Sequence, residues 1–383
     1  MDQDQQAIVK SNMDPRYAIA DTREIVTPAF VIFREILDAN LAEIVRIAGS
    51  AARLRPHCKT HKMREVIELE LAAGIAKHKC ATLAEAEMLA RAGVKDIFLA
   101  YNIVGANIAR VARFVQAFPD VRLAVTADHT RPVEELGRAL VAVGRQVEVL
   151  LDIDSGQHRT GLPVGDAARR LYAQIAVTPG LIAGGFHLYD GQNHQKSIDD
   201  RRVAVLAGYE PAARFRQELI AAGLSVPRIV AGGTGSFPIF AELDDPWLEL
   251  SPGTIIFHDS GYGETFPDLK FTPAALLLTR CISRPTDNRV TFDLGYKAVA
   301  SDPPAGNRLV FPDLPDAKAV LQNEEHLVLE TSAASRFQPG DELLAIPRHV
   351  CPTSALHKFV YVVREGKVVG TWQVAARDRV LTI

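Results

Sequence analysis

Short apolar runs alternate with longer amphipathic stretches through the middle of the chain. Residues 83–91 place apolar side chains at helical spacing, and Gly93 follows them as a C-terminal cap. Similar patterns predict helices within residues 131–143 and 196–222. The apolar runs themselves predict eight strands, at residues 54–59, 76–80, 97–101, 123–127, 147–152, 184–189, 229–232 and 247–250.

This alternation predicts an α/β fold with parallel strands. Eight strand–helix units in about 220 residues suggest a closed (β/α)8 TIM barrel, whose usual size is about 250 residues. We assign residues 34–270 to this barrel. A doubly wound open sheet is the structural alternative, but it needs a glycine-rich phosphate loop after its first strand. The first predicted strand instead runs into Arg-Pro-His-Cys-Lys-Thr-His-Lys, which argues against that alternative.

The pattern changes after about residue 270. Strand-like segments there are separated by clusters of Gly, Pro, Asp and Asn, which indicate turns. The run at residues 29–33 is one strand too many for an eight-unit barrel. We therefore predict a second, mostly β domain made of residues 1–33 and 271–383. Its expected C-terminal strands are residues 274–280, 289–293, 328–330, 343–346, 359–363 and 368–374.

Composition excludes several classes of protein. The chain has 383 residues, 48% of them hydrophobic and 23% charged, as in an ordinary soluble protein. Its net charge of −3 gives no general attraction to nucleic acid or to an anionic membrane. No apolar run approaches the roughly 20 residues that span a bilayer. The polar N-terminus lacks a signal-peptide core, and four widely spaced cysteines fit free thiols or metal ligands, so we expect a cytoplasmic protein.

Lys59 is the most informative candidate for chemistry. It follows the first predicted strand and is surrounded in sequence by other basic and imidazole groups. Nearby cations push an ammonium toward its neutral, nucleophilic form, which forms imines with aldehydes. The commonest aldehyde bound to proteins in this way is pyridoxal phosphate. The alternative is a cationic surface loop, which is where most lysines lie.

Other polar residues follow the later strands, where barrels keep their active sites. Backbone N–H groups and hydroxyls near the last two strands suit a phosphate, although such loops also form simple turns. Arg159 follows the fifth strand and is a candidate to face a pyridine ring, or else to pair with Asp152 or Asp154. The phosphate candidates are Gly233, Thr234, Gly235, Ser236, Gly253 and Thr254.

A pair of candidate metal ligands lies near the C-terminus. In an extended strand, His349 and Cys351 would face the same side and could bind one metal ion. An imidazole nitrogen with a thiolate suits Zn²⁺, and two protein ligands leave positions for water and substrate. The alternative is a buried structural cysteine beside a hydrogen-bonded histidine. Further candidate ligands are His194 and residues 324–326, which the sequence does not place at the ion.

These motifs together resemble the D-threonine aldolase and D-serine dehydratase group of fold-type III (alanine racemase-like) pyridoxal phosphate enzymes. The resemblance runs from about Thr27 to the C-terminus, and the segment around Lys59 is its most specific part. It implies that Lys59 carries the cofactor, that Arg159 meets the cofactor ring and that Tyr189 lines the site. It also implies the two phosphate loops, a homodimer, and a divalent metal at His349 and Cys351, with zinc favoured over manganese or magnesium.

Four functions remain open at this stage. The first is metal-dependent cleavage of D-3-hydroxy amino acids to glycine and an aldehyde, with His194 as a candidate base, and it is the one that we favour. The second is dehydration of D-serine or 3-hydroxyaspartate to an oxo acid and ammonia. Cys351 favours this second function and zinc, since aldolases of the group often have Asp there and dehydratases Cys. The third function is an amino-acid racemase, which needs no metal. The fourth is a non-catalytic cofactor carrier, which needs no second domain.

Overall fold

The structure is a computed structural model that describes residues 14–383, and it consists of two compact units. The predictions made for residues 1–13, a place in the β domain and the lack of a signal peptide, lie outside the described residues. One unit is a parallel barrel made of residues 39–258, 262–272 and 373–383. The described part of the other is a mostly β unit made of residues 14–38, 259–261 and 273–372.

The barrel unit is built on a seven-stranded sheet in which every neighbouring pair is parallel. The strands follow one another in chain order, as expected when each is joined to the next by a helical crossover. Their positions agree with the predicted apolar runs to within a few residues. The strands are β2 (Lys77–Cys80), β3 (Asp96–Asn102), β4 (Arg122–Ala127), β5 (Val147–Asp152), β6 (Leu181–Leu188), β7 (Ile229–Ala231) and β8 (Leu248–Leu250).

The segment that was predicted as the first strand closes this sheet into a barrel without forming a regular strand. Leu54 bridges β8 at Leu250, and His57 bridges β2 at Lys79, both in parallel. The backbone N–H of Arg55 donates to the carbonyl of Leu250 at 2.8 Å. Pro56 has no N–H to give to β2, so the ladder on that side is incomplete. The predicted barrel type of fold is confirmed, but with seven regular strands instead of eight, because the predicted first strand contributes only isolated bridges.

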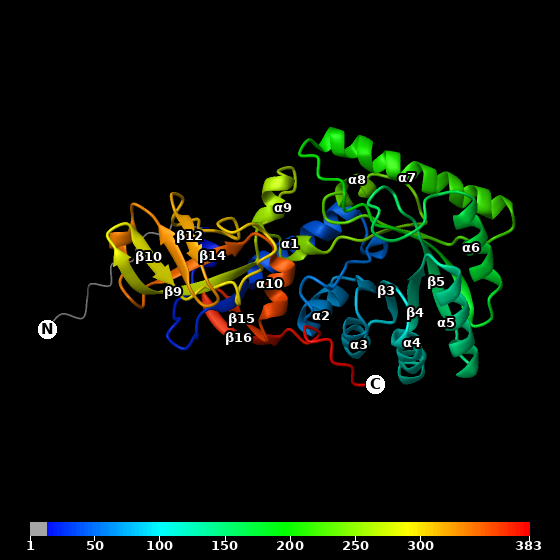
Figure 1. Cartoon of the computed structure of the whole chain (residues 1–383), viewed down its shortest axis with the longest axis horizontal. Coiled ribbons are helices and arrows are strands. Elements are labelled where there is room, and N and C mark those ends of the chain that lie inside the picture. Colours follow the sequence, from blue (N-terminus) through cyan, green and yellow to red (C-terminus); the bar gives the residue numbers. More distant parts are fainter. Residues whose placement is uncertain (1–13) are drawn as a thin grey trace. The chain divides into compact units, whose positions relative to one another are not determined.

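Helices cover the outside of the barrel. Thr82 caps α3 by accepting a hydrogen bond from the N–H of Glu85, and Gly93 takes the positive φ of 97° that follows the helix end. Figure 1 shows α3, α4 and α5 side by side along the strands. No helix among the described residues is long and apolar enough to cross a membrane. The helices of this unit are α2 (Arg64–Ala72), α3 (Leu83–Arg91), α4 (Ala106–Ala117), α5 (Thr130–Ala142), α6 (Asp166–Val177), α7 (Ile198–Ala221), α8 (Phe237–Ala241), η2 (Ala51–Arg53) and η3 (Thr254–Ile256).

The inside of the barrel has an apolar layer and an ionic layer. Phe98, Ala124, Leu150 and Val230 pack together as the buried apolar layer. Toward the N-terminal ends of the strands, the fully buried Arg55 forms ion pairs with Glu249 at 2.5 Å and with Asp96 at 2.7 Å. The network is completed by Lys77, Arg122, Glu148 and Arg228. The charges at this end of the barrel are therefore matched by partners within the barrel.

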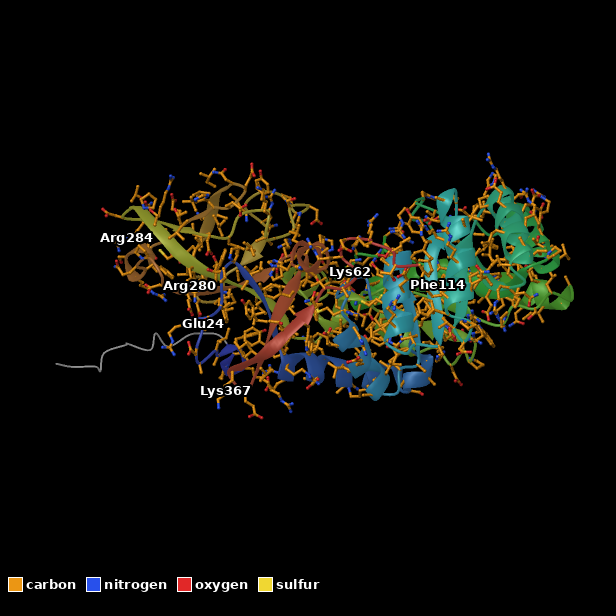
Figure 2. The ribbon with its side chains drawn as sticks, turned by 90° about the horizontal axis from the view of Figure 1, so that it is seen from below. Glu24, Lys62, Phe114, Arg280, Arg284 and Lys367 are labelled. Atoms are coloured by element: carbon orange, nitrogen blue, oxygen red, sulfur yellow. The ribbon has the colours of Figure 1, made fainter. Side chains whose placement is uncertain are left out.

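The mostly β unit is a largely antiparallel sheet in the order β12-β13-β10-β9-β1-β15-β16, with β14 pairing β9 and β11. The early strand β1 joins this sheet, between β9 and β15, as predicted. Figure 2 shows Arg280 and Arg284 spaced along β9, the longest strand. The strands are β1 (Ala29–Phe33), β9 (Ala275–Thr286), β10 (Arg289–Phe292), β11 (Leu309–Val310), β12 (Lys318–Gln322), β13 (Leu327–Glu330), β14 (Glu342–Pro347), β15 (Phe359–Arg364) and β16 (Lys367–Gln373).

Five further helices are described, of which α1 is the longest. Three of the boundaries between the two units fall inside α1, α9 and β16. The sequence analysis predicted neither β11 nor β12, and it wrongly predicted that the segment around Cys351 is extended. The remaining helices are η1 (Pro15–Tyr17), α1 (Arg34–Ala48), α9 (Ser260–Thr265), η4 (Ala334–Arg336) and α10 (Val350–Leu356).

Candidate functional site

A cavity of about 500 Å³ lies at the C-terminal ends of the barrel strands, where barrels place their chemistry. Three of the residues singled out from the sequence line it, namely Lys59, Arg159 and Tyr189. Its wall also includes polar groups that the sequence analysis did not select. The lining is His57, Lys59, Lys79, Ala81, Ala100, Tyr101, Asn102, Val104, Thr126, Asp152, Arg159, Thr160, His187 and Tyr189.

Three cationic side chains gather around the ring of Tyr189. The Nζ atoms of Lys59 and Lys79 lie 5.8 and 5.9 Å from its centroid, and the guanidinium carbon of Arg159 lies 4.8 Å from it. None of these three side chains forms a hydrogen bond or an ion pair with another residue of the described chain 14–383. This contrasts with the matched charges at the opposite end of the barrel. Unpaired cations around a cavity indicate that the cavity receives an anionic ligand.

His187 and Asp152 form a buried pair in the same wall. The Nδ1 of His187 lies 2.7 Å from an Asp152 carboxylate oxygen, while its Nε2 is buried without a partner. Burial, followed by the charges of Lys79 and Arg159, outweighs the attraction of Asp152 and lowers the pKa of His187. Although burial works against ionisation, the imidazole holds the pKa of Asp152 below its usual range. The imidazole is therefore neutral near neutral pH, with Nδ1 donating to Asp152.

The backbone around Lys59 is held by a second histidine. The Nδ1 of His57 accepts a hydrogen bond from the backbone N–H of Lys59 at 3.2 Å. Burial and the neighbouring ammonium groups of Lys59 and Lys79 hold the pKa of His57 well below its ordinary value. A neutral His57 can keep accepting this hydrogen bond, so the turn that carries Lys59 is fixed.

The glycine-rich loop after β7 does not line this cavity but lies against its wall. A side chain added at Gly233 would meet the Tyr189 ring at 3.1 Å, so the loop backbone packs closely on that residue. The Ser236 hydroxyl donates to Asp190 at 2.8 Å and accepts from the N–H of Gly233 at 3.1 Å. Burial raises the pKa of Asp190 against the effect of these hydrogen bonds. Thr234 is buried in the same loop.

The second candidate phosphate loop follows β8. A side chain at Gly253 would approach the Cβ of His57 at 3.2 Å, and Thr254 is buried at the start of η3. This loop therefore adjoins the turn that carries Lys59. The two loops lie beside the Tyr189 and His57 sides of the site, although neither forms the cavity wall itself.

His194, the candidate base, lies outside the cavity wall. It is exposed, and its ring stacks on Phe266 with centroids 6.4 Å apart. The structure does not bring it together with Lys59 in the way that it does Tyr189. Its role as a base stays a prediction.

The candidate metal pair lies at the N-terminus of a helix. His349 is the N-cap residue of α10 and Cys351 lies in its first turn, not on a strand. The two side chains interact with each other, and the Nδ1 of His349 lies 2.5 Å from an Asp302 carboxylate oxygen. Although burial opposes it, the contacts with Cys351 and Asp302 raise the pKa of His349 to about 9. Asp302 holds Nδ1 of His349, and the imidazole and the Cys351 side chain lie against each other, so one nitrogen and one sulfur donor come together as an N,S-ligated metal requires.

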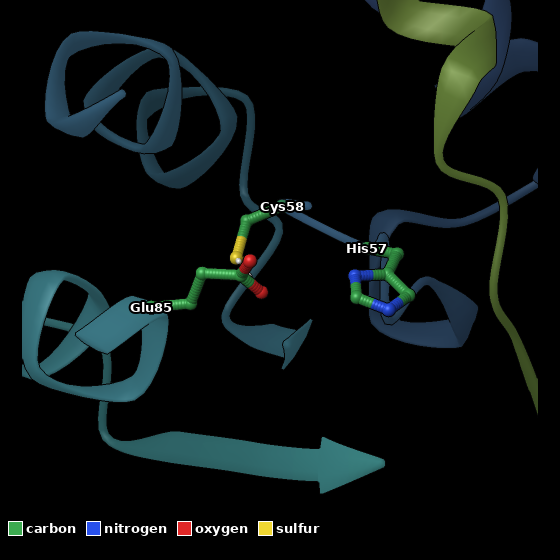
Figure 3. Close-up of side chains that lie close together, drawn as sticks. All are labelled: His57, Cys58 and Glu85. Carbon is green, nitrogen blue, oxygen red and sulfur yellow. Dashed lines mark hydrogen bonds between the residues drawn. The ribbon is translucent and has the colours of Figure 1, made fainter. Parts of the chain in front are cut away.

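His57, Cys58 and Glu85 also offer ligand atoms within 4.8 Å of one another (Figure 3). Glu85, however, is already bound: it pairs with Lys62 and accepts from the N–H of Ala81 at 2.6 Å. Burial, and next the charge of Glu85, raise the pKa of the Cys58 thiol well above its ordinary value. A neutral thiol beside a lysine-paired carboxylate is a poor metal site. We interpret this cluster as a structural support beneath Lys59.

Sequence reasoning missed three functional candidates, Lys79, His187 and Asp190. Lys79 is the last residue but one of β2, His187 lies in β6, and Asp190 follows Tyr189. The signal was available, because all three are polar residues at the C-terminal ends of predicted strands. What the sequence could not show is that Lys79 and Lys59 face the same cavity.

Comparison with known proteins agrees with this geometry. Residues 32–260 match the family model described as alanine racemase, N-terminal domain, and residues 274–363 match that of a putative serine dehydratase domain. The chain therefore belongs to the alanine racemase-like, fold-type III family of pyridoxal phosphate enzymes.

Relatives of known activity are found among lyases. A D-threonine aldolase of Arthrobacter sp is 30% identical over 358 residues, which cover 92% of each chain. The crystal structure of D-threonine aldolase from Filomicrobium marinum superposes with a TM-score of 0.86 at 30% identity, and covers 93% of this chain and 96% of that one. The D-threo-3-hydroxyaspartate dehydratase of Delftia sp. (strain HT23) is 26% identical over 374 residues, covering 91% of this chain and 96% of that protein.

The residues present fit the cofactor that this family implies. Pyridoxal phosphate combines an aldehyde, a flat ring and a phosphate. The cavity offers the amine of Lys59, a second lysine, an arginine without an ion pair among the described residues and a neutral histidine with an unpartnered Nε2, and glycine-rich loops adjoin it. The predicted cofactor is therefore consistent with the chemistry of this site.

Proposed function

We propose that this enzyme cleaves D-3-hydroxy amino acids to glycine and an aldehyde, with pyridoxal phosphate on Lys59 and a divalent metal at His349 and Cys351. The observation that supports it best is the unpaired Lys59, which faces a cavity lined with cations in a chain whose relatives include D-threonine aldolases. Bound pyridoxal phosphate supplies an aldehyde for the lysine amine and an electron-withdrawing ring that stabilises negative charge at Cα.

Residues around the cavity would hold and orient this cofactor. Arg159 and Tyr189 offer a cation and an aromatic face, 4.8 Å apart, for a flat anionic ring. His187 presents Nε2 from a ring that Asp152 holds in place. The backbone N–H groups of the loops at Gly233–Ser236 and Gly253–Thr254 are proposed to bind the phosphate, with Thr234 and Thr254 as hydroxyl donors. The Ser236 hydroxyl is less available, because it donates to Asp190.

The cleavage also requires removal of a proton from the β-hydroxyl group. A divalent ion held by His349 and Cys351 would lower the pKa of a hydroxyl that binds to it. The proton acceptor in this proposal is His194, acting directly or through a water molecule. The Cys351 thiolate favours zinc, and manganese and magnesium are the alternatives.

A dehydratase is the second candidate function. Two observations favour it: Cys351 supplies sulfur at the second ligand position, and a 3-hydroxyaspartate dehydratase is among the relatives. In that reaction Lys59 would take the α-proton, and the metal would assist departure of the hydroxide. The products would be an oxo acid and ammonia, so the two functions differ in a measurable way.

The deciding experiment is a product assay on the holoenzyme. Incubation with D-threonine should yield glycine and acetaldehyde, while 2-oxobutyrate and ammonia should be absent. Incubation with D-threo-3-hydroxyaspartate, with analysis for glycine and glyoxylate against oxaloacetate and ammonia, covers the acidic substrates. Formation of only an oxo acid and ammonia from both substrates would reject the aldolase and support the dehydratase.

A further inference from the structure

Lys79 is a buried lysine that lacks the usual partner. It is only 3% exposed, yet its ammonium forms no hydrogen bond or ion pair within the described residues. The buried Arg55 and Arg201, by comparison, are both ion-paired. Buried charges in proteins are nearly always paired, because removing an ammonium from water is costly. A lysine that breaks this rule while lining the cavity calls for a functional explanation.

The backbone places Lys79 and Lys59 on the same side of the barrel wall. Lys79 is bridged to His57, and the N–H of Cys58 donates to the carbonyl of Lys79 at 2.9 Å. Lys59 follows His57 by two residues, and both side chains line the cavity with Lys79. Both Nζ atoms lie within 6 Å of the Tyr189 ring centroid, at 5.8 and 5.9 Å. The two amines therefore share one small compartment.

Burial and the neighbouring charges make Lys79 a proton acceptor near neutral pH. Burial is the largest effect and the charge of Lys59 the next, and together they lower the pKa of Lys79 to about 7. Opposing contributions come from carboxylates, and Arg159 adds to the lowering. The titratable and charged groups that face Lys79 are His57, Lys59, Asp152, Arg159, His187 and Asp190.

A purely structural role does not account for the properties of Lys79. A structural lysine would be ion-paired, as Lys62 is with Glu85. A permanent anchor for an anion would keep its full charge in the empty site, which Lys79 does not do at neutral pH. Lys59, in contrast, needs a neighbouring group that accepts a proton from it. Its amine must lose a proton before it can bond to an aldehyde, and must do so again each time a substrate has displaced it.

We propose that Lys79 is the proton acceptor for Lys59. A proton leaves Nζ of Lys59 and binds Nζ of Lys79, directly or through one water molecule. Lys59 gains a free lone pair for bond formation, and the number of protons in the site does not change. Lys79 acts here on Lys59 and not on the substrate. This inference rests on the proposed attachment of pyridoxal phosphate to Lys59.

The test measures cofactor attachment, which needs no substrate. Wild-type protein and three variants, Lys79→Gln, Lys79→Arg and Lys95→Gln, are stripped of cofactor. Each is then mixed with pyridoxal phosphate across a pH series while the visible imine absorbance is followed. Lys95 is an exposed lysine in the loop before β3 and serves as the matched control. Thermal unfolding of each protein confirms that it is folded.

We expect Lys79→Gln to slow imine formation about tenfold or more near pH 7, in keeping with the loss of a general base. Its rate should recover as the pH is raised, because hydroxide can then remove the proton from Lys59 in place of Lys79. Lys79→Arg should be slow in the same way, since a guanidinium keeps its charge but accepts no proton. Lys95→Gln should match the wild type.

Two results would overturn the proposal. A wild-type rate and pH profile in Lys79→Gln would show that Lys79 takes no part. A wild-type rate in Lys79→Arg would show that only its charge matters, and this variant decides the question if Lys79→Gln does not fold. Absence of any imine in the wild-type protein would instead reject the proposed cofactor at Lys59, so the two failures are distinguishable.

Discussion

The Asp152 carboxylate holds Nδ1 of His187 at 2.7 Å and leaves Nε2 of that ring without a partner in the cavity wall. The pair lies at the ends of two adjacent strands, since β5 and β6 are in register at these two residues. The carboxylate keeps the proton of His187 on Nδ1, so Nε2 can accept a hydrogen bond from a ligand.

Replacing Asp152 by Asn should weaken binding of pyridoxal phosphate. The amide can present its N–H₂ to Nδ1 and favour the other tautomer of His187. A hydrogen bond to a charged group is worth about 1.5–3 kcal/mol, so we expect the dissociation constant to rise roughly ten- to hundredfold. Titration of the apoprotein with cofactor measures it, with the exposed Asp120→Asn as the control. Unchanged affinity in Asp152→Asn would refute a role for this pair.

The ring of Tyr189, more than its hydroxyl, should matter for the site. Its hydroxyl has no protein partner among the described residues, whereas three cations surround its ring. Cation–π contacts contribute about 0.5–2 kcal/mol. Tyr189→Phe should therefore retain cofactor affinity, while Tyr189→Leu should lose about two- to thirtyfold. Equal losses of cofactor affinity in Tyr189→Phe and Tyr189→Leu would instead show that the hydroxyl contributes to binding.

Metal binding should depend on Cys351 and not on Cys58. Cys351→Ser removes the thiolate from the candidate metal pair, while Cys58→Ser changes a buried neutral thiol. We expect Cys351→Ser to lose bound zinc and at least about tenfold in turnover, whereas Cys58→Ser keeps its metal content. Elemental analysis and steady-state assays measure both effects. Full turnover after verified removal of all metal by a chelator would contradict the catalytic role of the ion.

Acid should destabilise the barrel unit through Glu249. Burial opposes ionisation, but the charge and hydrogen bond of Arg55, with help from Lys77 and Arg228, lower the pKa of Glu249 from 4.5 to about 2. Because the folded-state pKa is depressed, this stabilisation is complete above about pH 4.5 and is lost as the pH falls toward about 2. At about 1.4 kcal/mol per pKa unit, its size is roughly 3 kcal/mol.

Glu249→Gln tests this directly. The substitution leaves Arg55 buried with only Asp96, so the free energy of unfolding at neutral pH should fall by about 3–5 kcal/mol. The acid dependence between about pH 4.5 and 2 should flatten as well. Glu330→Gln, which breaks an exposed pair with Arg289, should cost less than about 1 kcal/mol. Denaturant unfolding over a pH series measures both variants, and equal costs would show that burial of the network does not matter.

Much of the fold could be predicted from local pattern. The apolar runs predicted the barrel strands correctly, because a strand that is buried on both faces consists mainly of apolar residues. The early run at residues 29–33 was correctly assigned to the β unit, where β1 pairs β9 and β15. β11 and β12 were missed because they are short or exposed and carry little apolar signal.

The prediction around Cys351 failed for a local reason. An extended conformation was assumed there so that His349 and Cys351 would face the same side. The segment instead begins α10, because Pro352 is tolerated in the first turn of a helix, where its missing N–H has no partner to lose. The convergence of Lys59, Lys79 and His187 could not be predicted either. For Lys79 and His187 it depends on strand register, since one residue of slip would turn either side chain to the other face, and Lys59 lies on a turn.

The most direct test of the account is to trap the cofactor where it is bound. Protein purified with pyridoxal phosphate should show visible imine absorbance, and borohydride should remove it. Peptide mass spectrometry should then find the reduced adduct on Lys59, and Lys59→Ala should form no such adduct. An adduct on Lys79 or another lysine, or bound pyridoxal phosphate that borohydride does not fix to the chain, would contradict the central claim.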